Sequence, residues 1–199
     1  MKGTTFNARY SAQWQNTVLP YIRKLIFNLA STTDLYFFSE MLQSPLLPGL
    51  HANITKLDLS GFHWFSGITD NRHANPYLTL ASHLPLLSEL AFTLHTASIT
   101  ASMWGEMQMV ELEATDPVRA KARRVLSLRD VCAKYGLAAL FKCSELKRIR
   151  IVYIKSDIVT ANTPMVDPEK LIAAVRDWLT VEFAKRRQQQ VLVTISKVA

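Results

Sequence analysis

Glycine, cysteine and long apolar runs are scarce in this sequence, and each shortage excludes a class of protein. Only 6 of the 199 residues are glycine, which argues against a turn-rich β-barrel or β-sandwich. The two cysteines, Cys132 and Cys143, form no Cys-x-x-Cys pair and have no histidine at metal-ligand spacing, so we expect buried, reduced thiols and no metal. No window approaches about 18 uninterrupted apolar residues, so we expect no membrane-spanning helix.

Recognisable catalytic and targeting motifs are also missing. The sequence has no glycine-rich phosphate loop, no Gly-x-Ser-x-Gly nucleophile turn and no His-Glu-x-x-His helix, and we expect no cofactor. The N-terminal stretch "MKGTTFNARYSAQW" contains no apolar run of signal-peptide length. We therefore expect an intracellular protein, cytoplasmic or nuclear.

The composition that remains is that of one packed domain, which we expect to span residues 1–199. Apolar residues make up 49% of the chain and charged residues 20%. The net charge of +7 is concentrated in the second half, because residues 1–100 carry 6 Lys/Arg and 5 Asp/Glu whereas residues 101–199 carry 17 and 11. No nucleic-acid-binding motif accompanies this charge, so we expect a solvated surface rather than a nucleic-acid partner.

One apolar pattern occurs four times along the chain. The stretches "IRKLIF", "ITKLDL", "LSELAF" and "LKRIRI" begin at residues 22, 54, 87 and 146, and each has apolar residues at its first, fourth and sixth positions. The alternation of the last two predicts a strand with one buried face, and "VLVTI" at 191–195 predicts a fifth strand. The side chains expected on the buried face are Leu25, Phe27, Leu57, Leu59, Leu90, Phe92, Ile149 and Ile151.

Helical stretches lead into these strands. They read "FFSEMLQSPLLPGL", "LASHLPLL" and "LAALFKCSEL", and Pro48-Gly49, Pro85 and Gly136 punctuate them. Strands that alternate with helices predict an α/β fold, here a mostly parallel sheet of about five strands in chain order with helices on one side.

Two further helical segments are expected. Asp167 and Pro168 are suited to begin a helix over residues 168–186, whose apolar stripe includes Trp178, and we expect this ring to pack against the sheet. Between the third and fourth strands, residues 98–128 form an insertion that predicts two helices, the second of them beginning at Asp116-Pro117.

The repeated pattern, Leu-x-x-Leu-x-Leu followed by a turn, resembles the leucine-rich repeat. The approaches "LPLLSEL" and "CSELKRI", with "WGEMQMVELEATDP" and "LSLRDVCAKYGLAALFKCSELKRIRI", resemble the repeat region of fungal (ascomycete) F-box and leucine-rich-repeat-like proteins over residues 20–195. This resemblance implies a short, irregular repeat stack that binds a protein partner, without the F-box that recruits a ubiquitin ligase.

The polar side of the strands is the first candidate site. If the apolar residues face the core, their neighbours in the chain face outward and form a mixed polar ladder of the kind that binds a partner. The residues expected on this partner face are Lys56, Asp58, Ser60, Glu89, Thr93, Arg148 and Arg150.

The carboxyl ends of the strands are the alternative site, because ligands of parallel α/β folds gather there. Such a site would bind an apolar small molecule and move a proton, as in a cofactor-independent isomerase, cyclase or lyase. Its catalytic candidates are His63, His95, Tyr153 and Lys155, and its ligand-binding candidates are Trp64, Trp104 and Glu106.

A non-catalytic protein-interaction domain is the function that the sequence favours. We also expect self-association. The first strand begins only about twenty residues into the chain, and an uncovered strand edge pairs readily with a second copy. Either the apolar residues at 10–21 form a short helix over the first unit, or the first strands of two chains pair antiparallel.

Overall fold

Five parallel strands form the centre of the protein, as the sequence predicts. The structure, a computed structural model, describes residues 8–64, 74–163, 167–188 and 190–198. The strands lie in the order β1-β2-β3-β6-β7, which is their order along the chain, and every neighbouring pair is parallel. Their bounds are Phe27–Asn28, Lys56–Leu59, Glu89–His95, Arg148–Ile154 and Leu192–Val198.

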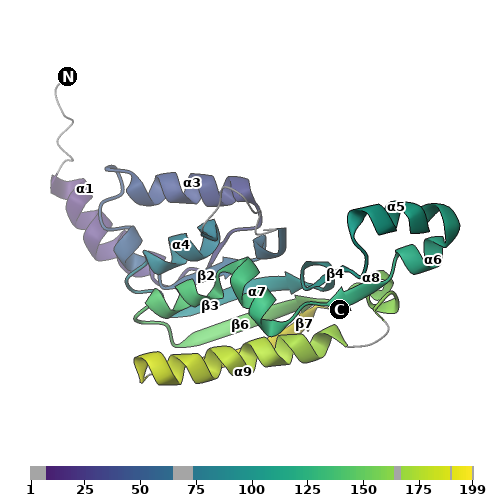
Figure 1. The fold of residues 1–199 in the computed structure, drawn as a ribbon. Helices are drawn as coiled ribbons and strands as arrows, with labels where there is room; N and C mark the ends of the chain where they lie inside the picture. The colour runs from purple at the N-terminus through teal and green to yellow at the C-terminus, as the bar shows by residue number, and fades with distance from the viewer. Residues whose placement is uncertain (1–7, 65–73, 164–166, 189, 199) are drawn as a thin grey trace.

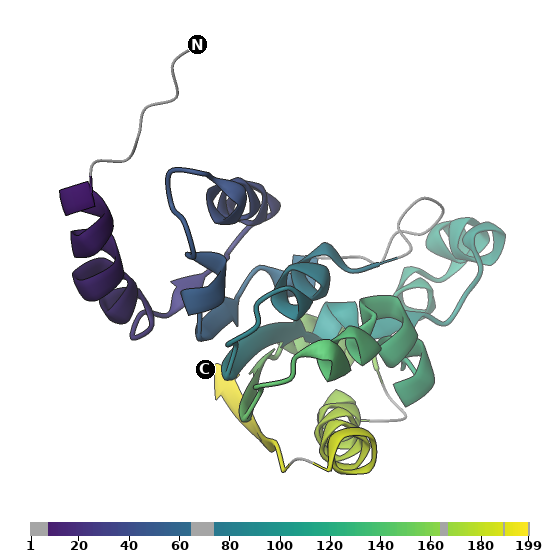
Figure 2. The ribbon, with the colours of Figure 1, turned by 90° about the vertical axis from the view of Figure 1, so that its left-hand side faces the viewer.

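The connecting helices cover one face of this sheet (Figures 1 and 2). Each connection therefore leaves the sheet on the same side and returns one strand further along. The helical layer consists of α3 (Thr32–Gln43), α4 (Pro76–Ser82), α7 (Leu128–Tyr135), the 3-10 helix η5 (Leu137–Lys142) and α9 (Pro168–Arg187). The expected α/β fold with a largely parallel sheet in chain order is confirmed. Among the described residues, no helix is both long enough and apolar enough to cross a bilayer.

The sheet buries one aligned row of apolar side chains under the helices. Backbone pairing places Phe27 beside Leu57, Leu57 beside Leu90, Leu90 beside Ile149 and Ile149 beside Val193. The row is almost completely buried in the three central strands, where Leu57, Leu90 and Ile149 are at most 2% exposed. A second buried row contains Leu59, Phe92 and Ile151, so all six of the core residues expected on these strands are confirmed.

The first unit differs from the expected alignment by two residues. Leu25 lies before the strand and is half-buried, whereas Phe27 occupies the row that Leu25 was expected to fill. Leu29 then takes the place expected for Phe27, and its N–H donates to the carbonyl of Asp58 at 2.8 Å. The chain is still helical at Ile22, so it becomes extended too late for Leu25 to join the ladder. A shift of two residues keeps the same side chains on each face, so the expected face is right and the register is wrong.

The N-terminal segment forms a helix over the first unit. It runs through α1 (Ala8–Gln13), a π-helical turn η1 (Trp14–Val18) and α2 (Leu19–Ile22), and α1 lies beyond β1 in Figure 2. The indole of Trp14 donates to the Pro48 carbonyl at 2.8 Å, and Trp14, Val18 and Leu19 pack against the core. This arrangement matches the first of the two expectations for residues 10–21.

The remaining helical expectations are confirmed with one correction. Asp167 caps α9, because its carboxylate accepts the N–H of Glu169 at 3.0 Å. Trp178, however, is half-buried and packs its ring against Phe141 of η5, with ring centroids 5.4 Å apart. It contacts the neighbouring helix because Leu179 and Phe183, on the adjacent stripe, already fill the space above the strands.

The insertion between β3 and β6 projects from one end of the sheet (Figure 1). It contains the expected helices α5 (Glu106–Thr115) and α6 (Pro117–Ala120), and the carboxylate of Asp116 caps α6 by accepting the N–H of Arg119. It also contains a small antiparallel ladder between β4 (Thr100–Ser102) and β5 (Arg123–Val125), which the sequence pattern does not predict.

Gly61 marks the tightest approach between two units. Its N–H donates to the Leu29 carbonyl at 2.9 Å, and a Cβ at this position would overlap the carbonyl oxygen of Ala30 and lie 2.5 Å from its carbonyl carbon. Main-chain atoms cannot move aside as the end of a side chain can. The end of β2 therefore requires a residue without a side chain.

We predict that Gly61→Ala destabilises the protein by about 2–3 kcal/mol, the usual cost of overpacking. For a chain of this length the melting temperature would fall by roughly 5–10 °C. Gly105→Ala is the control, since a Cβ there meets nothing within 4 Å. Thermal unfolding followed by circular dichroism compares the two variants, and equal shifts would contradict the close approach.

Candidate functional site

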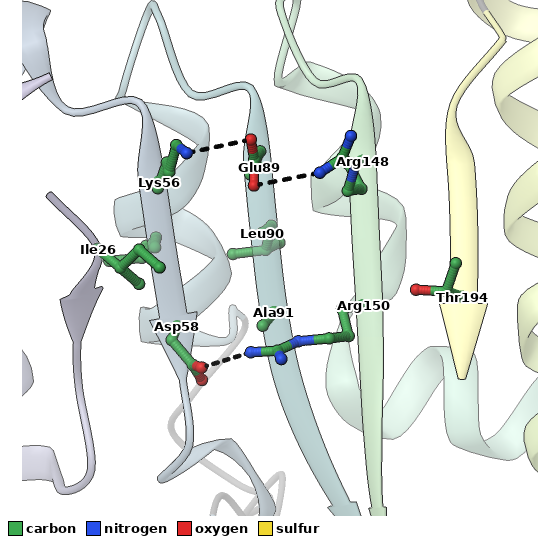
Figure 3. A pocket seen from close by; sticks show the side chains of 10 residues that line it. Ile26, Lys56, Asp58, Glu89, Leu90, Ala91, Arg148, Arg150 and Thr194 are labelled. Atoms are coloured by element: carbon green, nitrogen blue, oxygen red, sulfur yellow. Dashed lines mark hydrogen bonds and ion pairs between the residues drawn. The ribbon is translucent and has the colours of Figure 1, made fainter. Parts of the chain in front are cut away.

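The sheet face opposite the helices, which we call the open face, gathers most of the polar residues expected to bind a partner. Side chains alternate along each strand, so the residues between the buried ones point away from the helical layer. The open face is built from Ile26, Asn28, Lys56, Asp58, Glu89, Ala91, Arg148, Arg150, Leu192 and Thr194. Figure 3 shows the part of it that crosses from β1 to β7.

Three charged residues form the first row of the open face. Lys56, Glu89 and Arg148 stand side by side in the register of β2, β3 and β6. The carboxylate of Glu89 lies between the two cations, 3.4 Å from the Lys56 Nζ and 3.8 Å from the Arg148 Nη1 (Figure 3). Cross-strand pairs of this kind contribute about 0.2–1 kcal/mol each, so they order the side chains more than they hold the fold.

The second row contains an ion pair that spans three strands. The Arg150 guanidinium donates to the Asp58 carboxylate at 3.1 Å, although β3 lies between their strands (Figure 3). The residue of β3 in this row is Ala91, which is only 7% exposed because the arginine crosses above it. The small side chain of Ala91 is what leaves room for this crossing.

A shallow hollow of about 230 Å³ lies between these rows. Ile26, which is 64% exposed, lines it on the β1 side, and Leu192, which is 57% exposed, lies beside Arg148 on β7. Ile26 and Thr194 also line the hollow, at the outward positions that the strand alternation predicts for them, although neither is among the residues expected to bind the partner.

Of the other two residues expected on the partner face, Ser60 bonds to a neighbour on that face and Thr93 is buried. The Ser60 hydroxyl donates to the Asn28 side-chain oxygen at 2.6 Å and so joins β2 to β1. Thr93 is only 4% exposed and is not available to a partner. Thr93 lies beside Val152 in the register of β3 and β6.

The strand ends bring together two of the four expected catalytic residues. The rings of His63, in the 3-10 turn η3 (Phe62–Trp64), and His95, at the end of β3, stack with centroids 6.1 Å apart and an angle of 26°. The Nδ1 of His63 lies 2.9 Å from the Ser60 carbonyl. The Nδ1 of His95 accepts the N–H of Ala97 at 3.0 Å and caps the next turn, η4 (Thr96–Ser98).

Burial lowers the pKa of His63 below its ordinary value of 6.5, and the nearby His95 lowers it further. The hydrogen bond to Ser60 opposes both effects without overcoming them. A neutral His63 at neutral pH can accept or donate a proton. The stacked rings can equally be a structural contact that joins the turn after β2 to the end of β3.

Tyr153 and Lys155 lie apart from this histidine pair. Tyr153 follows Ile149 and Ile151 on the buried face of β6, whereas His95 follows Glu89 and Ala91 on the open face of β3. The Tyr153 hydroxyl is 3.1 Å from the buried Thr96 hydroxyl, and burial raises its pKa. Lys155 forms an ion pair with Glu169 at 3.5 Å. The two side chains serve the packing of α9 and of the strand ends.

The three expected ligand-binding residues are not gathered at the strand ends either. The Trp104 indole donates to the Arg119 carbonyl at 2.7 Å, with the guanidinium of Arg119 5.0 Å from its ring, so it closes the projecting insertion. Glu106 is exposed in the first turn of α5. Trp64 ends η3, and its side chain lies outside the described residues.

The thiols and acidic groups of the described residues form no metal site of three or more ligands. Cys143 is buried and Cys132 is half-buried, both are free thiols, and burial raises the pKa of each to about 11. At neutral pH both are therefore protonated and unsuited to nucleophilic chemistry.

Comparisons with known proteins give no relative: no family model, no curated protein and no solved structure matches this chain. The resemblance to the repeat region of fungal F-box proteins therefore stays a prediction.

We predict that His63 titrates below pH 6.5 and that His95→Asn raises its pKa. The variant removes the positive charge that forms next to His63 and keeps an oxygen that can cap Ala97. Because the folded pKa is below the unfolded one, the unfolded chain binds the proton more readily, so the stability from this group falls as pH drops through 6.5 and levels off below the folded pKa. Imidazole NMR signals followed against pH measure the pKa of His63 in the wild type and in the variant.

A His63 midpoint at or above 6.5 would contradict the burial of the ring, and a midpoint that His95→Asn leaves unchanged would show that His95 does not lower the pKa of His63.

Proposed function

We propose that this protein is a non-catalytic interaction domain that binds a protein partner on the open face of its sheet. The observation that carries the proposal is the one-sided helical layer, which leaves the polar face of a five-stranded sheet uncovered by the described residues (Figure 2). Stacked α/β units use such a face for binding, since neighbouring strands present many side chains in a fixed array. This use also agrees with the predicted leucine-rich-repeat-like character.

The charges of the open face indicate the chemistry of the partner. Lys56, Arg148 and Arg150 outnumber the carboxylates of Asp58 and Glu89, and the two arginine side chains are the most exposed of the five at 59% and 51%. Apolar Ile26 and Leu192 border the row of charges. A segment with acidic side chains between apolar ones fits this order, because carboxylates pair with the free sides of the guanidinium groups.

A small enzyme or small-molecule binder at the strand ends is the second candidate, and only the stacked histidines favour it. Of the other expected catalytic groups, Tyr153 is buried beneath the opposite face and Lys155 is held by Glu169. The hollow on the open face and the groove between α3 and α4 are lined by other residues. The interaction domain therefore accounts for more of the structure.

We predict that Arg148→Glu combined with Arg150→Glu strongly weakens partner binding. The two changes invert the exposed charge of the face, while the ion pairs that they remove contribute only about 0–1 kcal/mol each to stability. Purified protein as bait, with quantitative mass spectrometry of what it retains, compares the variant with the wild type. We expect an acidic partner whose retained amount falls at least roughly tenfold with the double variant, which corresponds to about 1.4 kcal/mol of binding free energy.

The matched control is Arg129→Glu combined with Lys142→Glu, which makes the same charge change at exposed positions of the helical layer. If both double variants lost the partner equally, the binding would depend on the net charge of the protein or on another surface, and not on the open face. Retention by the open-face variant, with an unchanged melting temperature, would overturn the proposed function.

A further inference from the structure

The last strand of the sheet has one paired edge and one outer edge. β7 pairs with β6 along all seven of its residues, and among the described residues no strand lies on its other side. The N–H of Leu192 donates to the Lys147 carbonyl at 2.9 Å, toward β6. In a parallel ladder both main-chain groups of a residue point to the same neighbour and alternate along the strand. Val193, Ile195 and Lys197 therefore direct their N–H and C=O groups outward.

The outer edge of β7 lacks the usual protection against pairing. Natural edge strands are kept short, charged, bulged or covered. The opposite edge strand, β1, has two residues and lies next to the N-terminal helix, whereas β7 has seven residues and no proline. Leu192, Ile195 and Val198 are 57%, 38% and 49% exposed. The single cation of the strand, Lys197, forms an ion pair with Glu169 at 3.1 Å, a carboxylate that it shares with Lys155.

The sequence of β7 is partly symmetric about its middle residue, with Val193 and Lys197 as the one unlike pair. In "LVTISKV" the outermost residues are both apolar, the two that flank Ile195 both carry hydroxyl groups, and Ile195 stands alone at the centre. In an antiparallel pair of identical strands related by a two-fold axis, each residue meets its counterpart from the other end, so this partial symmetry places apolar side chains opposite apolar ones and hydroxyl groups opposite hydroxyl groups.

We propose that β7 pairs antiparallel with β7 of a second copy of this chain, with the two-fold axis at Ile195. Ile195 then faces Ile195 of the other copy, and Val193 faces Lys197. These are the outward-directed residues, so each facing pair exchanges two main-chain hydrogen bonds, about six in all. Between them Thr194 faces Ser196, and Leu192 faces Val198, which buries the exposed apolar side chains against each other.

The pairing needs no rearrangement of either chain. The main chain that carries the outward N–H and C=O groups is already extended, and Lys197 keeps its ion pair with Glu169 on the helical side of the sheet. A two-fold axis perpendicular to the sheet keeps both helical layers on one side and both open faces on the other. The product is one continuous sheet whose two open faces lie side by side. This differs from the expected dimer through the first strand, where β1 offers only two residues.

Sedimentation velocity over a range of protein concentrations tests the proposal. We expect a species of twice the 22.5 kDa chain mass that Ile195→Lys converts to the monomer, because the variant places two like charges at the centre of the interface. Ile26→Lys is the control, since it changes an exposed isoleucine beside the opposite edge strand and should leave the dimer intact. Dissociation by Ile26→Lys instead of Ile195→Lys, or a monomer at every concentration, would overturn the proposal.

A cysteine pair tests the register without disturbing the centre. In the chain carrying both Thr194→Cys and Ser196→Cys, each new thiol faces its counterpart in the other copy at a Cα separation of about 4.5 Å, within disulfide range. Mild oxidation should yield a covalent dimer on non-reducing gels, and each single variant should yield much less. Equal cross-linking by the single variants, or none by the double variant, would exclude this register.

Discussion

The aligned row of Phe27, Leu57, Leu90, Ile149 and Val193 is the constraint on which the rest of the structure depends. Five parallel strands can bury this row only when their registers agree, because a slip of one residue would turn every side chain to the opposite face. Once the row is fixed, the second buried row and both rows of the open face follow from the alternation. The ion pairs of the open face are thus a consequence of the core rather than a separate design.

The one-sided helical layer separates the two faces into different chemical environments. Under the helices the ring of Phe62 packs against Tyr135 and Phe92, with centroids 5.0 and 5.1 Å away respectively. Asn75, the N-cap of α4, connects that helix to this cluster by donating to the Tyr135 carbonyl at 2.9 Å. On the other face the same strands carry exposed arginines. Burial of apolar surface stabilises the first face, whereas the exposed ion pairs of the second contribute little to stability.

The sequence was sufficient to predict the central strands and insufficient wherever neighbouring strands decide the outcome. The alternation is strong in β2 and β3 because each strand buries two apolar residues at alternate positions, Leu57 and Leu59 in β2 and Leu90 and Phe92 in β3. In the first unit "IRKLIF" fits the full pattern, whereas the observed register places Lys24 at the first apolar position of the pattern, so the sequence alone favours the wrong register.

The candidate site shows the same limit. Alternation within each strand predicted which residues point outward, but not that Arg150 crosses Ala91 or that Thr93 is covered, since both depend on side-chain sizes in the next strand. The separation of Tyr153 from His95 could have been foreseen. Tyr153 follows Ile151 by two residues and shares its face, whereas His95 follows Phe92 by three and does not.

The two ends of the insertion between β3 and β6 lie side by side. Its chain passes outward at Ser102 and returns at Arg123, and these two residues face each other in the antiparallel ladder of β4 and β5. The segment between these two residues therefore starts and ends at neighbouring positions of one ladder. Its length places little constraint on the sheet, because the entropy cost of closing a loop grows only with the logarithm of its length. The protein therefore carries a natural graft point, where a tight hairpin or a complete foreign domain with adjacent termini can replace residues 103–122 while the stacked units keep their registers.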